Sequence, residues 1–196
     1  MLKKLLAVLC MLAALAGLSA CGEKQLKFEN TDLTGLGYGK GFSLNDHTGK
    51  PVTLDTYKGK VVVLFFGFTH CPDVCPTTMA EMSAVMKELG PDADKVQVLF
   101  ATLDPERDTK ELLAQYVPGF DPRFAGLYGT PAQVDATAKE FKVFYRKVPG
   151  KTADSYTIDH TAGSYVFDKN GKIRLFLRHG GGTAPIVHDL KLLLGA

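Results

Sequence analysis

The stretch VVVLFFGFTHCPDVCP, residues 61–76, decides the fold class of this chain. Its first part, residues 61–66, is a continuous apolar run bounded by glycines, which is typical of a strand covered on both faces in a parallel sheet. Pro76 then stands where proline is favoured, at the first position of a helix, and apolar residues recur at helical spacing as far as Leu89. The order of strand, cysteine loop and helix places the cysteines at the end of a strand where sites in open α/β sheets are commonly built.

Strand-like and helix-like segments alternate on both sides of this stretch. Residues 42–44 and 52–54 flank a turn-rich segment and predict a hairpin. Downstream, the pattern predicts a strand over 96–102, helices over 109–116 and 131–141, a hairpin formed by 162–167 and 173–177, and a helix over about 185–194. We therefore expect one α/β domain with a mixed central sheet, an N-terminal β-hairpin and flanking helices.

The composition is that of an ordinary globular protein. Of the 196 residues, 45% are hydrophobic and 22% are charged, which excludes a disordered, collagen-like or coiled-coil chain. The 23 basic and 21 acidic residues indicate no strongly basic face, so we expect no binding to nucleic acid. A chain of this length folds without a disulfide scaffold, so its four cysteines need another explanation.

The first twenty residues have the pattern of an export signal. A basic start precedes an apolar stretch over 5–18, which is shorter than the ~20 residues of a membrane-spanning helix. The four residues that end in Cys21 resemble the bacterial lipobox, whose cysteine becomes the lipid-modified first residue. We predict a lipoprotein signal peptide (1–20), a tether (21–40) and a folded domain (41–196), anchored through Cys21 to the periplasmic or another extracytoplasmic face of a membrane. A permanent transmembrane anchor and a soluble secreted protein are the alternatives.

Two cysteines remain for chemistry in the mature chain. Cys10 leaves with the signal and Cys21 would carry the lipid, which leaves Cys71 and Cys75. A helix N-terminus favours a thiolate, so these two are plausible metal ligands or a redox-active pair, and in an oxidising compartment they can form a disulfide. Their separation of four is too short to staple a fold.

His160 is the favoured third ligand among the five histidines. It opens a predicted strand, and pairing of that strand beside residues 61–66 would bring its N-terminal loop near the cysteines. His70 is the rival, but in an extended segment its side chain points away from that of Cys71. Two thiolates and one imidazole favour Cu(I), tolerate Cu(II) and could hold zinc with an added water. Copper–thioether binding is an alternative for three methionines whose helical spacing instead favours core packing: Met79, Met82 and Met86.

Three segments, 66–76, 103–109 and 159–161, resemble the signature stretches of the Sco/SenC family. The resemblance implies a thioredoxin-like fold and a copper chaperone that delivers copper to the binuclear copper centre of cytochrome c oxidase. The copper, as Cu(I) or Cu(II), would be held by a set of three ligands: Cys71, Cys75 and His160. The implied partner is the copper-centre subunit of the oxidase or another copper chaperone.

Three charged residues of the middle segment, 103–109, are candidates for structural roles. Asp104 matches an acidic family position near the site, and it is equally interpreted as a turn residue at the end of a strand. We interpret Asp108 as a helix N-cap. We expect Arg107 to pair locally with Asp108 and Glu111 rather than with a partner protein.

A thiol-disulfide oxidoreductase is the alternative function. It would reduce cysteines of the acceptor protein or act in redox signalling, with Cys71 or Cys75 as the attacking thiolate and the other as the resolving thiol. His160 would then be dispensable. A peroxide-reducing enzyme on the same fold is a third hypothesis, and it would need an activated cysteine. The sequence therefore leaves open whether the protein is an enzyme.

Overall fold

A computed structural model describes residues 26–152 and 155–196 of the chain. The predicted signal peptide and the predicted lipid attachment site, Cys21, lie outside these residues. No helix of the described part is long and apolar enough to cross a membrane.

Strands and helices alternate along the described residues. The strands are β1 (Thr31–Asp32), β2 (Leu44–Asp46), β3 (Pro51–Val52), β4 (Val61–Gly67), β5 (Val96–Thr102), β6 (Ala125–Tyr128), β7 (Tyr145–Pro149), β8 (Tyr156–His160), β9 (Gly163–Phe167) and β10 (Ile173–Arg178). The α-helices are α2 (Val74–Leu89), α3 (Lys110–Tyr116), α4 (Pro131–Glu140) and α5 (Thr183–Gly195), and two 3₁₀ helices are η2 (Leu54–Tyr57) and η3 (Gly90–Lys95).

Eight of these strands form one mixed sheet, in the order β1-β10-β9-β4-β5-β6-β2-β3. β4 is a central strand, parallel to β5 and antiparallel to β9, and all seven of its residues are buried, as its apolar run predicts. The N-terminal hairpin of β2 and β3 and the later hairpin of β9 and β10 are both present. The predicted α/β class with a mixed central sheet is therefore confirmed.

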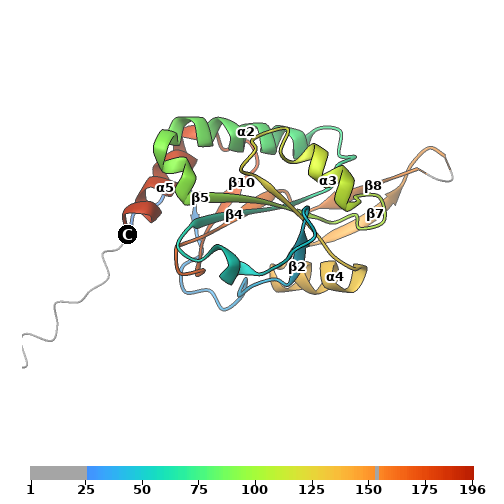
Figure 1. Cartoon of the computed structure of the whole chain (residues 1–196), viewed down its shortest axis with the longest axis horizontal. Helices are drawn as coiled ribbons and strands as arrows, with labels where there is room; N and C mark the ends of the chain where they lie inside the picture. Colours follow the sequence, from blue (N-terminus) through green and yellow to red (C-terminus); the bar gives the residue numbers. More distant parts are fainter. Residues whose placement is uncertain (1–25, 153–154) are drawn as a thin grey trace, which may run out of the picture.

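Helices cover both faces of this sheet (Figure 1). α2, α3 and α5 lie on one face and α4 lies on the other. Because side chains alternate along a strand, Val63 and Phe65 of β4 pack under α2, while Leu64 and Phe66 pack in the opposite layer. Each face of the sheet thus has its own apolar core, and β4 contributes to both.

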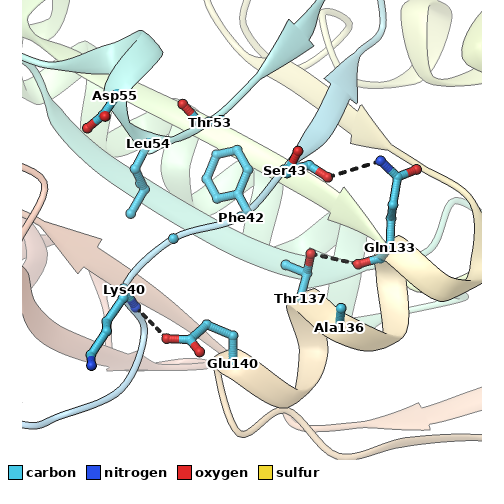
Figure 2. A pocket seen from close by; sticks show the side chains of 11 residues that line it. Lys40, Phe42, Ser43, Thr53, Leu54, Asp55, Gln133, Ala136, Thr137 and Glu140 are labelled. Atoms are coloured by element: carbon cyan, nitrogen blue, oxygen red, sulfur yellow. Dashed lines mark hydrogen bonds between the residues drawn. The ribbon is translucent and has the colours of Figure 1, made fainter.

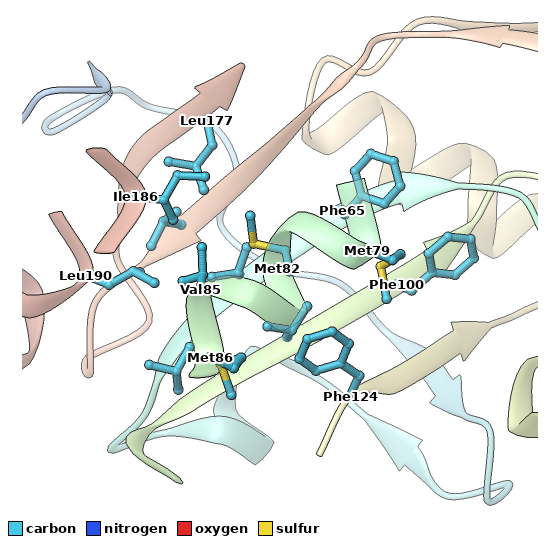
Figure 3. Packing of buried hydrophobic residues seen from close by; sticks show 14 of the residues in the cluster. Phe65, Met79, Met82, Val85, Met86, Phe100, Phe124, Leu177, Ile186 and Leu190 are labelled. Carbon is cyan, nitrogen blue, oxygen red and sulfur yellow. The ribbon is translucent and has the colours of Figure 1, made fainter. Parts of the chain in front are cut away.

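The three methionines of α2 belong to the first of these cores. Each is at most 1% exposed, and Figure 3 shows them among aromatic and aliphatic side chains of the sheet and of α5. The helical spacing of Met79, Met82 and Met86 therefore reflects core packing, as predicted, rather than a surface that offers thioethers to copper.

Some elements differ from the prediction. α2 begins at Val74 with Asp73 as its N-cap, so Pro76 is its third residue rather than its first. The hydrophobic pattern does not predict β6 or the pair β7 and β8. β7 has no buried residue and β8 has one, so alternation between apolar and polar residues is weak in both.

Residues 26–40 lie against the domain, although their composition suggests a tether. β1 pairs with β10, and Leu33 is buried. The buried carboxylate of Asp189 on α5 accepts hydrogen bonds of 2.9 Å from the backbone N–H groups of Glu29 and Asn30. Strand pairing with β10 and the buried carboxylate of Asp189 thus fix a polar segment whose own sequence contains no periodic signal.

Candidate functional site

The two cysteines lie where β4 ends and α2 begins. Cys75 is the second residue of α2 and is fully buried, whereas Cys71 in the preceding loop is half-buried. The backbone N–H of Cys75 donates to Cys71 Sγ over 3.4 Å. That contact satisfies one of the first N–H groups of the helix, which have no partner within the helix itself. Both thiols are free, and the structure brings them together.

Gly67, the last residue of β4, makes room for the sulfur of Cys75. A Cβ atom at this position would lie 2.9 Å from Cys75 Sγ, 2.8 Å from Cε1 of Phe65 and 3.0 Å from Cε2 of Phe100. These separations are shorter than normal packing distances, so only glycine fits. By sequence, Gly67 marks only the end of a strand, because nothing in the pattern reveals which side chains will surround it.

His160 reaches the cysteines from the small two-stranded sheet of β7 and β8. Its Nε2 atom lies 3.7 Å from Cys75 Sγ. Its Nδ1 atom lies 3.0 Å from the carbonyl oxygen of Thr161, which can only accept a hydrogen bond, so Nδ1 carries the proton. Nε2 therefore keeps its lone pair and presents it to Cys75.

The predicted proximity is present, although His160 stands on a different strand from the one predicted. It ends β8, whereas the hairpin expected to begin near it starts at Gly163 with β9. β9 pairs antiparallel with β4, so the start of β9 lies at the same end of the sheet as the cysteines. Because only two residues separate His160 from β9, pairing of β9 with β4 still brings His160 near the cysteines.

Burial keeps both Cys75 and His160 uncharged. Burial raises the pKa of the Cys75 thiol above its ordinary value, a hydrogen bond with the Phe68 backbone opposes this, and the nearby Cys71 and Asp108 raise it further. Burial also lowers the pKa of His160 below its ordinary value. The neutral thiol of Cys75 therefore donates to Nε2 of a neutral imidazole. At Cys75 burial outweighs the helix N-terminus, which by itself would favour a thiolate.

The separation of Cys75 and His160 suits two ligands on one metal ion. A metal–sulfur bond of about 2.3 Å, a metal–nitrogen bond of about 2.0 Å and an angle of about 120° separate the two atoms by about 3.7 Å. That is the distance observed. Cys71 Sγ instead accepts the Cys75 N–H, and within residues 26–152 and 155–196 no three acidic, cysteine or histidine side chains form a closed site. A third ligand thus requires a reorientation of Cys71.

The loop between β5 and α3 carries a buried carboxylate that holds the cysteine loop. Asp108 accepts hydrogen bonds from the backbone N–H of Thr69 at 3.0 Å and from its hydroxyl at 2.6 Å. It also accepts one from the hydroxyl of Thr102 at 2.6 Å. The prediction that Asp108 caps α3 is wrong: Thr109 is the N-cap, and its hydroxyl accepts an N–H of the first turn. The donors around Asp108 come from the cysteine loop and from the last residue of β5, and they occupy its carboxylate in place of the first turn of α3.

Asp104, in the same loop, is fully buried and contacts β8. Arg107 Nε donates to one of its carboxylate oxygens, and the hydroxyl of Tyr156 donates to the other at 2.8 Å. The guanidinium of Arg107 also stacks on the ring of Tyr156, 3.5 Å from its centroid. Arg107 therefore pairs locally, as predicted, although its partner is Asp104. Tyr156 is a residue that the sequence does not single out, because its strand has no detectable pattern.

The other four histidines have partners away from the two sulfurs. Nδ1 of His70, the rival ligand, lies 3.1 Å from the hydroxyl of Thr69 and 3.8 Å from Asp108. His47 contacts the N–H of Gly126 and His179 contacts the hydroxyl of Thr78. His188 contacts the carboxylate of Asp189. Among the described histidines, the geometry therefore favours His160 over His70 as a partner of the cysteines.

A cavity of about 650 Å³ lies elsewhere, between the segment before β2 and α4 (Figure 2). Phe42 and Leu54 line it together with charged side chains at its edges, among them Lys40 and Glu140. Neither the two cysteines nor His160 contribute to its walls. The cysteine site is thus not part of this cavity.

Comparison with known proteins adds a family match. The SCO1/SenC family model matches residues 31–195. A SCO2-like protein of Rickettsia felis is 38% identical over 142 residues, which cover 72% of this chain and 68% of that protein. The human mitochondrial protein SCO1 homolog is 41% identical over 136 residues, which cover 67% of this chain and 44% of the human protein. The chain thus matches about two thirds of the rickettsial relative and less than half of the human one.

Solved structures share the fold. ScoI of Bradyrhizobium japonicum with copper bound is 43% identical, with a TM-score of 0.74, and the match covers 80% of this chain and 99% of that chain. Apo Sco1 of Thermus thermophilus is 38% identical, with a TM-score of 0.75, and covers 88% and 100%. Yeast Sco1 with copper bound is 28% identical, with a TM-score of 0.73, and covers 81% and 89%. These matches confirm the predicted thioredoxin-like fold.

Proposed function

Because this chain belongs to the SCO1/SenC family, we propose that it binds one copper ion and delivers it to the binuclear copper centre of cytochrome c oxidase during assembly of that enzyme. Copper is bound in the related ScoI of Bradyrhizobium japonicum and in Sco1 of yeast. In the present chain, the contact of 3.7 Å between Cys75 Sγ and His160 Nε2 carries the proposal. The acceptor of the copper is the copper-centre subunit of the oxidase or another copper chaperone.

Cys71, Cys75 and His160 are the proposed copper ligands. Two thiolates and one imidazole make a soft, three-coordinate set that favours Cu(I) and tolerates Cu(II). Each thiol must lose its proton to bind, so copper binding releases protons and the affinity rises with pH. The raised pKa of Cys75 keeps this dependence active at neutral pH. Nε2 of His160 needs no deprotonation, because the proton of the ring is already on Nδ1.

Transfer of the ion proceeds by exchange of ligands. Incoming thiolates of the acceptor replace His160 first and then the two cysteines, so copper remains bound throughout. His160 is suited to leave first because it belongs to a separate small sheet, whereas Cys75 is buried in the core. No change in the oxidation state of copper is needed.

Copper titration of the reduced protein tests this function. We expect stoichiometric binding of one ion with thiolate-to-copper absorption in the Cu(II) form. The double variant Cys71→Ser/Cys75→Ser should lose both while remaining folded, because a domain of this size does not depend on its cysteines to fold. Equal copper binding by the wild type and the double variant would contradict the proposal.

The second candidate, a thiol-disulfide oxidoreductase, is favoured by the contact of the Cys75 N–H with Cys71 Sγ at 3.4 Å, which brings the two cysteines close enough for a disulfide to be considered. The burial and raised pKa of Cys75 oppose its use as the attacking group, because attack on a disulfide needs a thiolate, so the half-buried Cys71 would attack in such an enzyme. The variant His160→Ala separates the two candidates. Loss of oxidase assembly with intact dithiol exchange supports copper delivery, whereas full retention of assembly supports the oxidoreductase.

We further propose that the mature protein begins at Cys21 and is held by lipid on the periplasmic or another extracytoplasmic face of a membrane. The lipobox-like segment supports this proposal, and a SCO1/SenC lipoprotein of Bacillus anthracis is 26% identical to this chain. Mass spectrometry of the membrane-extracted protein tests it. A diacylated or triacylated N-terminal peptide is expected for the wild type, and Cys21→Ser should abolish the modification.

A further inference from the structure

We propose that the loop of Asp104 and Asp108 positions the two halves of the copper site relative to each other, and that Arg107 and Tyr156 connect this loop to the strand of His160. The inference rests on the proposed copper binding and goes beyond it. It assigns a positioning role to residues that do not bind the ion. The starting observation is that the proposed ligands belong to two structural units, the main sheet with α2 and the small sheet of β7 and β8.

Among the strands that the structure describes, no strand-to-strand hydrogen bonds join the small sheet to the main sheet. β7 and β8 pair only with each other and project from one end of the domain (Figure 1). Beyond the two-residue connection from His160 to β9, the orientation of His160 therefore depends on side-chain contacts at the base of this hairpin. Without such contacts the hairpin would be free to carry its imidazole away from Cys75.

One face of β8 provides these contacts. Tyr156, Ile158 and His160 share a face because side chains two residues apart lie on the same side of a strand. Ile158 is buried in the core beside α2, and His160 packs edge-on against the rings of Phe65 and Phe68. Tyr156 is the polar anchor of this face.

Tyr156 is held at three points. Its hydroxyl donates to Asp104 at 2.8 Å, its backbone carbonyl accepts from Arg107 Nη1 at 3.0 Å, and its ring stacks under the guanidinium of Arg107 at 3.5 Å. Burial and the Asp104 carboxylate raise the pKa of Tyr156 to about 12, so the hydroxyl remains a donor at all physiological pH values. Beside it, Lys147 of β7 forms an ion pair of 2.6 Å with Glu106 of the same loop.

The same loop also holds the cysteine side of the site. Asp108 accepts two hydrogen bonds from Thr69, two residues before Cys71. Asp104 and Asp108 are joined in one turn, since the N–H of Asp108 donates to the carbonyl of Asp104 at 2.9 Å. The hydroxyl of Thr102 links them again, because it donates to Asp108 and accepts from the Asp104 N–H. The distance between the cysteine loop and the hairpin is thus set by one turn with two buried carboxylates.

Two conservative variants test this role. Tyr156→Phe keeps the ring stack and removes the bond to Asp104. Arg107→Lys keeps the charge and removes the planar group that contacts Asp104 and the carbonyl of Tyr156 together. The matched control is Arg146→Met, which breaks an exposed ion pair of 3.1 Å with Asp159 on the same hairpin. All three variants remove polar interactions of the hairpin, and only the first two loosen its contact with the loop.

Two readouts distinguish positioning from general stability. In the copper-free protein, we expect faster amide hydrogen exchange in β7 and β8 for Tyr156→Phe and Arg107→Lys, with unchanged exchange in β4 and α2. In the copper-loaded protein, we expect a weaker or absent nitrogen ligand by electron paramagnetic resonance of the Cu(II) form. Cu(II) affinity should fall about tenfold or more, because residues that orient metal ligands commonly contribute 10–100-fold to affinity. Arg146→Met should resemble the wild type in both.

The outcomes separate this inference from the proposed function. If the wild type binds copper while Tyr156→Phe and Arg107→Lys keep the nitrogen ligand and normal exchange in the hairpin, the positioning role is wrong and copper binding stands. Equal effects of Arg146→Met and Tyr156→Phe also overturn the role. If the wild type binds no copper, the proposed function fails, and hydrogen exchange in the copper-free protein still decides whether the loop holds the hairpin.

Discussion

Gly67→Ala should damage the proposed copper site through a single methyl group. Ordinary contact distances begin at about 3.4 Å, so a Cβ atom 2.9 Å from Cys75 Sγ requires the sulfur to move by about 0.5 Å. The rings of Phe65 and Phe100 lie at 2.8 and 3.0 Å from the same point, so the methyl group has no free direction. Overpacking of this kind costs roughly 1–3 kcal/mol of folding stability. A displacement of ~0.5 Å also reaches the limit within which ligand sets must be held.

Two measurements on the same protein check this expectation. Chemical denaturation should show a loss of roughly 1–3 kcal/mol in the free energy of unfolding. Copper titration in competition with a chelator should show roughly tenfold or greater weakening, because the sulfur of Cys75 is displaced from the position that faces His160. Gly37→Ala is the control, since a Cβ atom there meets nothing within 4 Å and the residue has no positive φ. Wild-type stability and wild-type copper affinity in Gly67→Ala would refute the account of why glycine ends β4.

Three further predictions concern buried polar groups. Burial opposes ionisation of Asp189, but hydrogen bonds from Glu29, Asn30 and His188 outweigh it and hold the pKa below its ordinary value. The stabilisation is therefore present above about pH 4 and is lost as pH falls through the lowered pKa. Asp189→Asn should lower the free energy of unfolding by roughly 2–3 kcal/mol at pH 7. In urea denaturation, the free energy of unfolding of this variant should depend less on pH between about pH 2 and 5 than that of the wild type. The Tyr116 hydroxyl is buried without a partner among the described residues, so Tyr116→Phe should leave thermal stability unchanged or raise it by up to ~1 kcal/mol, and a loss above that would contradict the reasoning. Asp108→Asn removes a charge that raises the pKa of Cys75, so alkylation of this thiol should begin at a lower pH than in the wild type.

The strand and helix around the cysteines are predictable because the information for them is local. The run over 61–66 is apolar at every position, and β4 is buried throughout. The helical spacing after Pro76 matches α2 to its end at Leu89. Propensity, periodicity and the stop signal agree over this stretch, so no distant contact is needed to predict it.

The hairpin that carries His160 is not predictable in the same way. Its strands alternate weakly, and its position depends on contacts of Tyr156 with Arg107 and Asp104, which lie about fifty residues earlier in the chain. Strand pairing of β9 with β4 was enough to bring His160 near the cysteines, although the strand assignment itself was wrong. A contact can thus be predicted from topology while the element that makes it is missed.

The prediction that Asp108 is the N-cap of α3 is wrong for a different physical reason. Asp108 and Thr109 are adjacent, and both residue types are good N-caps, so local rules cannot choose between them. The structure assigns the cap to Thr109 because the hydroxyl and N–H of Thr69 and the hydroxyl of Thr102 occupy the Asp108 carboxylate. Long-range donors decide the competition, and they are not visible in the segment itself.

The division of the proposed ligands between two units bears on how a carrier can both hold and release copper. Cys75 is part of the buried core, so its place is fixed whether or not an ion is bound. His160 is connected to that core by side-chain contacts from a separate two-stranded sheet, so bound copper would add a bond between the units. Part of the binding free energy is then spent on ordering the hairpin, and the net affinity is lower than for three ligands on one rigid element. An acceptor that supplies thiolates can therefore displace the imidazole without unfolding the core. The two-part construction explains in physical terms how firm binding of copper is compatible with its transfer.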